Sequence, residues 1–312
     1  MVVSKIGFGA WGIGGSSWGG PNDNSSMAAL ARAFDSGINF VDTALVYGVG
    51  HSEQLIARVL KPRKDRVYIA TKVPPKNMLW PARPGIPLRK VFPFRYFKQC
   101  TDQSLRNLQR DVIDLLQFHV WNPEWVEEDD WRRSVEWAKQ TGKARFVGIS
   151  VNDHQPASVL SALKTGLIDC VQVIYNIFDQ SPADELFPFC QQMDLGVIAR
   201  VPFDEGGLTG TITPDTTFAS NDMRIRYFGG ERKREVWQRV QEICRDCGDQ
   251  EPISHIAVRF CLSHPAVSTV IPGMRNAAHV ADNMAAAAAG PLPANLLAIL
   301  SRHRWQRNFY ET

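Results

Sequence analysis

The chain has 312 residues, of which 44% are hydrophobic and 21% are charged, and its formal net charge is +3. This length is enough to bury the core of one large α/β domain or of two ordinary ones. The small net charge argues against a nucleic-acid partner. No apolar run of about 18 residues is present, so no membrane span is predicted.

Short apolar segments rich in Val and Ile alternate with longer segments of helical periodicity. The expected strands are residues 5–10, 38–42, 67–72, 113–119, 144–150, 170–174, 196–201 and 268–271. The expected helices are residues 25–37, 52–60, 97–108, 131–141, 156–165, 182–193, 232–247, 253–263 and 277–287, with another after residue 291. Eight buried strands, each followed by a helix, predict α/β architecture: one (β/α)8 TIM barrel over residues 1–312.

The six cysteines are scattered along the chain. Cys244 and Cys247 form a CxxC inside a helical pattern, and no second pair is present to complete a zinc ribbon. The N-terminus "MVVSKIGFGAWG" has no cleavable apolar segment, so no secretory signal is predicted. Free thiols are typical of a reducing compartment. We therefore expect a cytoplasmic protein without a metal site; an oligomer is compatible with the sequence.

The stretch "GFGAWG", residues 7–12, matches the G-x-G-x-x-G pattern of dinucleotide-binding Rossmann units. In such units the helix opens at the glycines and an acidic residue follows about 20 residues later. Here helical periodicity begins only near Ser25, and Asp42 lies 30 residues after Gly12. The pattern therefore favours a barrel strand that ends in a glycine-rich loop.

Four ionisable residues come at or just after the ends of three consecutive expected strands. Asp42 ends the second strand with Tyr47 in the loop beyond it, Lys72 ends the third, and His119 ends the fourth. Neighbouring parallel strands lie about 4.8 Å apart, so these side chains converge on the barrel mouth, where barrel active sites form. Taken singly, three of them also have a structural interpretation: Asp42 as a loop cap, Lys72 as a rim lysine and His119 as a satisfied histidine.

Together the four residues make a coherent proton-transfer site. A tyrosine phenol titrates near 10, and a nearby lysine cation is expected to lower that pKa. A carboxylate keeps the lysine charged, and a neutral histidine hydrogen-bonds a substrate oxygen. Such a site gives a proton to a carbonyl oxygen while another group supplies hydride.

At these residues the chain resembles the aldo-keto reductase superfamily. The segments "GINFVDTALVYGVGHSEQLIARVL", "VYIATKV" and "DLLQFHVW" carry the four residues, and "GKARFVGIS", "VQVIYN" and "VIPGMRNAAHVADN" follow in family order. The resemblance implies a (β/α)8 barrel that binds NADPH, or less often NADH, and interconverts carbonyls and alcohols. It implies Tyr47 as the acid–base residue, Lys72 and Asp42 as groups that tune it, and His119 as the group that orients the carbonyl.

The resemblance also implies a set of cofactor contacts. Ser150 and Gln172 would hold the nicotinamide carboxamide, with Asp42 and Trp11 nearby. The loop from Arg200 to Leu208 would flank the nicotinamide and the pyrophosphate. Residues between Gly273 and Asn283 would hold the adenosine end. The implied cofactor-binding residues are Trp11, Asp42, Ser150, Gln172, Arg200, Val201, Pro202, Phe203, Leu208, Gly273, Met274, Arg275, His279, Asp282 and Asn283.

The chain departs from the family pattern in four places. Most of the family's N-terminal β-hairpin is absent before the first expected strand. The common Ser-Asn after strand five is replaced by Ser150-Val151, with Asn152 one place later. Arg200 stands where many members place an aromatic ring, and His279 replaces a more usual Gln or Arg.

Two other functions are open at this point. A cofactor-binding module could sense redox state or regulate a partner with slow turnover, and a Schiff-base aldolase could use Lys72 as its nucleophile. The "IPG" segment argues against the aldolase, which needs no adenosine site. For substrate binding we expect Trp80 and Trp121, which would favour an apolar or ring-shaped carbonyl; alternatively, these aromatic residues only pack the loops.

Overall fold

The computed structural model describes residues 1–15, 18–20, 22–248 and 251–305. Eight parallel strands follow one another around a single sheet in chain order. They are β1 (Phe8–Gly9), β2 (Phe40–Asp42), β3 (Tyr68–Val73), β4 (Ile113–Phe118), β5 (Ala144–Ser150), β6 (Cys170–Ile174), β7 (Gly196–Arg200) and β8 (Thr269–Val270). Parallel bridges join Ile6 to Val270 and Gly9 to Gly273, so β1 and β8 meet and the predicted barrel is confirmed.

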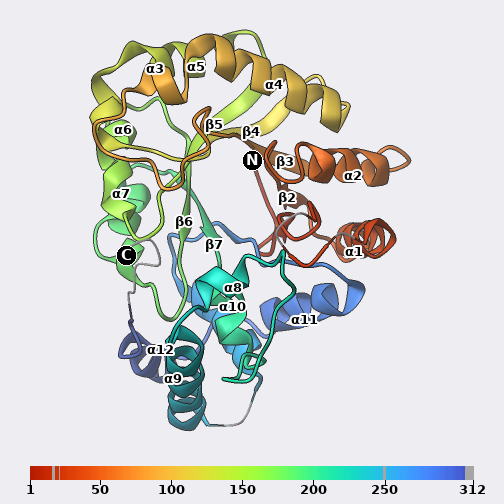
Figure 1. The fold of residues 1–312 in the computed structure, drawn as a ribbon, viewed down its shortest axis with the longest axis vertical. Coiled ribbons are helices and arrows are strands. Elements are labelled where there is room, and N and C mark those ends of the chain that lie inside the picture. Colours follow the sequence, from red (N-terminus) through yellow and green to blue (C-terminus); the bar gives the residue numbers. More distant parts are fainter. Residues whose placement is uncertain (16–17, 21, 249–250, 306–312) are drawn as a thin grey trace.

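Helices surround the strands, with α1 and α2 on one side and α6 and α7 on the other (Figure 1). The longer helices are α1 (Asp23–Asp35), α2 (His51–Leu60), α4 (Phe94–Leu108), α5 (Asp129–Gln140), α7 (Leu186–Gln192), α9 (Arg232–Cys247), α10 (Ile253–Ser263), α11 (Ala277–Ala288) and α12 (Ala294–Ser301). Three four-residue helices, α3 (Leu88–Val91), α6 (Leu160–Leu163) and α8 (Arg224–Tyr227), complete the set of α-helices in the described ranges. None of the helices in those ranges is long and apolar enough to cross a membrane.

Two predicted helices each begin instead with a 3-10 turn that has a proline at its first or second position. The expected helix over 156–165 is a 3-10 turn at Pro156–Val159 followed by α6. The expected helix over 182–193 is a 3-10 turn at Ser181–Ala183 followed by α7. Proline suits the first positions of such a turn because it has no N–H to donate, and its fixed φ favours a tight start.

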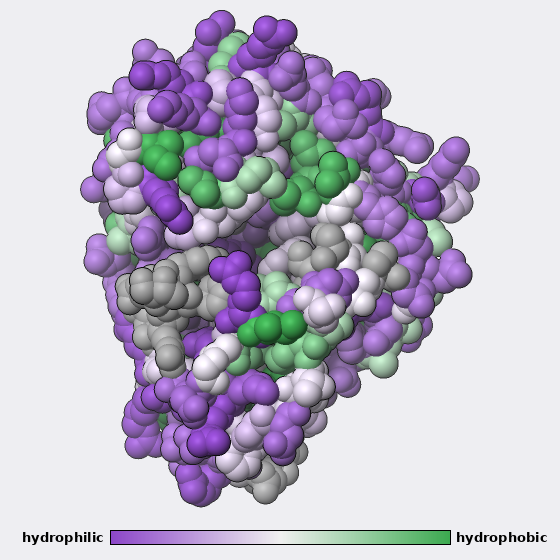
Figure 2. Space-filling view, in the orientation of Figure 1, coloured by the Kyte–Doolittle hydropathy of each residue, from purple (hydrophilic) through white to green (hydrophobic). Residues whose placement is uncertain are grey.

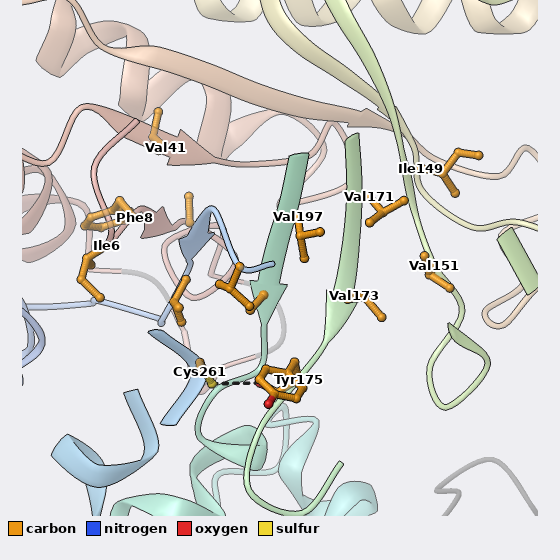
Figure 3. Packing of buried hydrophobic residues seen from close by; sticks show 14 of the residues in the cluster. Ile6, Phe8, Val41, Ile149, Val151, Val171, Val173, Tyr175, Val197 and Cys261 are labelled. Carbon is orange, nitrogen blue, oxygen red and sulfur yellow. Dashed lines mark hydrogen bonds between the residues drawn. The ribbon is translucent and has the colours of Figure 1, made fainter. Parts of the chain in front are cut away.

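The strands alternate between two environments, as the two-residue period of a strand requires. One set of side chains points out toward the helices; Figure 3 shows Val41, Ile149, Val171 and Val197 in that large cluster. The other set points into the barrel. Its apolar members are Phe40, Ala70, Leu115, Cys170, Ile198 and Ile271.

The polar residues of the predicted site lie two positions further along these inward-facing rows. Asp42 follows Phe40, Lys72 follows Ala70, and Gln172 follows Cys170. The period therefore places them inside the barrel at its C-terminal end, above an apolar floor.

Candidate active site

Asp42 and Lys72 form a buried ion pair at the mouth of the barrel. Lys72 Nζ donates to Asp42 Oδ2 over 2.6 Å and to the carbonyl oxygen of Thr43 over 2.8 Å. Lys72 is 0% exposed and Asp42 is 3% exposed. Burial lowers the pKa of Lys72, and the adjacent Asp42 carboxylate opposes that shift. Because its amine is buried and bonded to a carboxylate, Lys72 is a poor candidate for a Schiff-base nucleophile.

Two glutamines complete the surroundings of Asp42. Its Oδ1 accepts from Gln172 Nε2 at 2.7 Å and from Gln117 Nε2 at 3.4 Å. Gln172 was predicted as a cofactor contact; with its Nε2 given to Asp42, its Oε1 is the atom left to accept from a ligand. Gln117 was not predicted, although it lies two residues before His119 and pairs with Lys72 in the β3–β4 register.

Tyr47 lies beside this pair among aromatic rings. Its ring stacks on Trp11 at 6.1 Å between centroids and meets His119 edge-on at 5.9 Å, and Lys72 Nζ lies 5.1 Å from its centroid. Burial raises the pKa of Tyr47, and so does the Asp42 carboxylate, while Arg200 opposes the shift. The expectation that the Tyr47 pKa is lowered is therefore wrong. The phenol keeps its proton at neutral pH.

His119 is placed to meet a ligand oxygen. Burial, reinforced by the charges of Lys72 and Arg200, lowers its pKa well below the usual value, so the imidazole is neutral. Its Nδ1 is buried and has no hydrogen-bond partner among the residues that the structure describes. Trp80 meets the ring edge-on at 5.7 Å. Ring contacts thus join Trp11, Tyr47, His119 and Trp80 in that order at the mouth.

The glycines of "GFGAWG" and the loop after it have steric reasons to be glycine. A Cβ at Gly9 would lie 2.7 Å from the carbonyl oxygen of Ile271, and one at Gly14 would lie 2.9 Å from the backbone of Tyr47. Helix α1 begins only at Asp23. These contacts support the rejection of the Rossmann interpretation, since the glycines allow β1 to approach β8 and the Tyr47 loop.

The predicted nicotinamide contacts Ser150 and Gln172 are paired in the β5–β6 register. Arg200 ends β7, and its guanidinium is bonded to residues that follow β5. It forms an ion pair with Asp153, and its Nη2 also donates to the carbonyl oxygen of Val151 at 3.0 Å.

The loop after β7 holds an acidic residue that was not predicted. Glu205 adopts a left-handed conformation with φ of 54°. Its pKa is raised to about 8 by burial and by Asp204 and Asp153, against Arg200 and Arg224. A carboxyl that titrates near neutral pH therefore lies in the loop expected to flank the cofactor pyrophosphate.

The predicted adenosine end includes a polar hollow of about 200 Å³ between the starts of α1 and α11. It is lined by Gly12, Gly20, Asn22, Ser25, Ser26, Arg275, Asn276 and His279. Arg275 Nη1 donates to the Trp18 carbonyl oxygen at 2.7 Å, and the Trp18 ring lies 5.0 Å from the Arg224 guanidinium. A guanidinium beside amide and hydroxyl groups is a donor set that suits a phosphate.

The other predicted cofactor residues differ in what they can offer a ligand. Leu208 and Met274 are 0% exposed in the core, so neither residue presents accessible surface to a ligand in this structure. Asn283 is also buried, whereas the Asp282 side chain is 72% exposed and lies 3.8 Å from His255.

The structure contradicts the predicted substrate contact at Trp121. Its side chain is 0% exposed and packs against Phe118, Trp125 and Trp131, with ring centroids 5.3 to 6.0 Å away. The alternative that aromatic residues pack the loops therefore holds at Trp121. Trp80 remains half-buried beside His119.

Apolar side chains gather in the upper half and near the centre of a largely hydrophilic face (Figure 2).

The comparisons with known proteins agree with the barrel and its mouth. A model of the Aldo/keto reductase family matches residues 5–304. The chain belongs to the aldo-keto reductase family. As a member it is an NAD(P)H-dependent oxidoreductase. The polar groups of Ser150 and Gln172 at one end of the site, and of Arg275 at the other, fit such a cofactor.

Individual relatives span nearly the whole chain. It is 28% identical over 284 residues to aldo-keto reductase YhdN of Bacillus subtilis (strain 168), covering 88% of this chain and 82% of the relative. It is 28% identical over 304 residues to the NADH-specific methylglyoxal reductase of Escherichia coli (strain K12), covering 92% and 90%. The holo form of aldo-keto reductase AKR11C1 from Bacillus halodurans superposes with a TM-score of 0.78 at 26% identity, covering 99% and 96%.

Proposed function

We propose that the protein reduces an aldehyde or ketone to an alcohol with NADPH, or catalyses the reverse, with Tyr47 as the proton donor. The observation that carries this proposal is the meeting of a protonated Tyr47, a neutral His119 and the Lys72–Asp42 pair at one point of the mouth. When bound, a reduced nicotinamide supplies hydride to the carbonyl carbon.

The residues of the chain handle the oxygen of the substrate. His119 is neutral, so its N–H orients the carbonyl oxygen without adding charge. Tyr47 gives its phenolic proton to the oxygen as negative charge develops there. Lys72, held by Asp42, faces the Tyr47 ring and compensates the negative charge that then forms on the phenol. Ser150 and Gln172 Oε1 would hold the carboxamide end of the cofactor.

The direct test is oxidation of NADPH by the purified protein with a panel of aliphatic and aromatic aldehydes and ketones. Turnover that requires both a carbonyl and the cofactor supports the proposal. Cofactor binding without turnover on any carbonyl would instead support a sensing or regulatory module.

The NADPH preference rests on Arg275, which borders the polar hollow. Arg275→Ala should weaken the binding of NADPH by about 10- to 100-fold, because the charge-assisted contact with its adenosine 2′-phosphate is worth ~1.5–3 kcal/mol. The binding of NADH, which lacks this phosphate, should stay nearly unchanged. Titration of each cofactor by fluorescence measures the two Kd values. Equal weakening of both cofactors, or a wild-type preference for NADH such as the name of the Escherichia coli relative states, would refute the assignment.

Glu205 predicts that cofactor affinity depends on pH. Its carboxyl, with a pKa of about 8, is neutral below that pH and anionic above it. An anion there repels a pyrophosphate, so the Kd for NADPH should rise by about tenfold between pH 7 and pH 9. Glu205→Gln should bind NADPH at pH 9 as tightly as the wild type does at pH 7. Identical pH profiles in the two proteins would mean that Glu205 does not face the pyrophosphate.

A further inference from the structure

The long β3–α4 connection carries Trp80 to the mouth, and its backbone is held by side chains from outside it. Asn122 Nδ2 donates to the carbonyl oxygen of Arg83 at 3.1 Å, and Glu124 Oε2 accepts from the Gly85 N–H at 2.8 Å. Further along, Trp125 Nε1 donates to the Ile86 carbonyl oxygen at 2.7 Å, and Glu128 Oε1 accepts from the Leu88 N–H at 2.7 Å. We call residues 76–91 the Trp80 wall.

Asn152 makes the hydrogen bonds to this connection that lie nearest to Trp80. Its Oδ1 accepts from the Ala82 N–H at 3.2 Å, and its Nδ2 approaches the Ala82 carbonyl oxygen at 3.4 Å. The same Oδ1 accepts from the Trp121 N–H at 3.4 Å, at the end of β4. Asn152 is 4% exposed, so these bonds form out of water, where a lost partner is costly. One amide therefore joins the loops after β3, β4 and β5.

We propose that Asn152 is a positioning residue for substrate selection: it fixes the Trp80 wall against His119 and does not bind the cofactor carboxamide. Both ends of its amide are committed to Ala82, two residues from Trp80, and its Nδ2 also donates to Gln155 Oε1 at 3.1 Å. Trp80 in turn meets His119 edge-on at 5.7 Å. The wall therefore holds one flat ring, that of Trp80, beside the carbonyl-orienting group.

The consequence is a preference for carbonyl substrates that carry a flat ring. A planar substrate that reaches His119 gains contacts with the Trp80 ring only if Trp80 is fixed in place. A small aliphatic aldehyde makes few of these contacts. This inference rests on the proposed carbonyl reduction at Tyr47.

The test compares an aromatic aldehyde, 2-naphthaldehyde, with propanal in Asn152→Ala. The kcat/KM for 2-naphthaldehyde should fall by about tenfold, with less than a twofold change for propanal and for the Kd of NADPH. The opposite result, a weaker NADPH complex with unchanged selectivity, would show that Asn152 binds the cofactor. Gln155→Ala is the matched control, since it removes an Asn152 bond without touching Ala82, and it should behave as wild type.

Two further measurements keep the test independent of stability and of turnover. Glu124→Ala alters an exposed residue that holds Gly85, so it should change selectivity in the same direction without disturbing the core. Hydrogen exchange of residues 76–91 should quicken in Asn152→Ala even if the protein reduces no carbonyl, which separates failure of this inference from failure of the proposed function. In a Trp80→Ala background, Asn152→Ala should add no further loss; independent losses would refute positioning through Trp80.

Discussion

Tyr47→Phe is expected to lower kcat for carbonyl reduction by ~10²–10⁴-fold, the range typical of a lost general acid. The phenylalanine ring keeps the stacking on Trp11 and the edge contact with His119, so only the hydroxyl is lost. The raised pKa of Tyr47 means that the wild-type phenol is protonated over the whole neutral range. The loss should therefore be the same at every pH between about 6 and 8, since no titration of this group falls there.

Cofactor titration provides the control for this variant. The Kd for NADPH should stay within about twofold of wild type, because the proton is used only in the chemical step. An isotope effect with deuterated cofactor shows whether chemistry limits kcat. A variant that keeps wild-type kcat while chemistry is rate-limiting would rule out Tyr47 as the acid.

The inward-facing rows of the barrel explain how much of this site could be predicted. Strand period and chain order place Asp42, Lys72 and His119 at neighbouring strand ends, and the structure brings them to one point. The same reasoning extends to Gln117, which stands two residues before His119 on the same strand. The two-residue period of inward-facing positions, counted back from His119, would have predicted that Gln117 lies beside Asp42.

Features that depend on burial or on contacts between distant loops could not be predicted in this way. Trp121 follows a strand end, as a mouth residue would, but it packs against Trp131 of α5. The Tyr47 pKa rises because desolvation exceeds the effect of nearby cations, and sequence spacing carries no measure of desolvation. Likewise, the pairing of Arg200 with Asp153 joins the end of β7 to the loop after β5, which only the folded barrel brings together.

Asn152 shows how a one-residue shift changes the role of a side chain. In the family pattern an asparagine follows the serine at the end of strand five directly, whereas here Val151 intervenes. The amide of Asn152 contacts the backbone of Ala82 through both its oxygen and its nitrogen, which is why we propose that it does not hold the carboxamide. Ser150 and Gln172 then remain as the proposed carboxamide contacts.

Lys72→Met is expected to lower kcat by about 10²-fold or more, and the double variant Tyr47→Phe/Lys72→Met should be little worse than Tyr47→Phe alone. Lys72 touches Asp42 and faces the Tyr47 ring, so it acts on the reaction through the Tyr47 proton. Once the hydroxyl is gone, the cation has no proton left to influence, and the two losses do not add.

Removing Lys72 leaves the Asp42 carboxylate buried without its cation, which by itself costs stability by ~3–5 kcal/mol. The amides of Gln172 and Gln117 still donate to it, and Asp42→Asn combined with Lys72→Met removes the unpaired charge altogether. Thermal unfolding of the single and combined variants separates the loss of stability from the loss of rate. If the combined variant recovers stability while kcat stays low, Lys72 serves the proton transfer. Fully multiplicative losses with Tyr47→Phe would instead give Lys72 a role separate from the phenol.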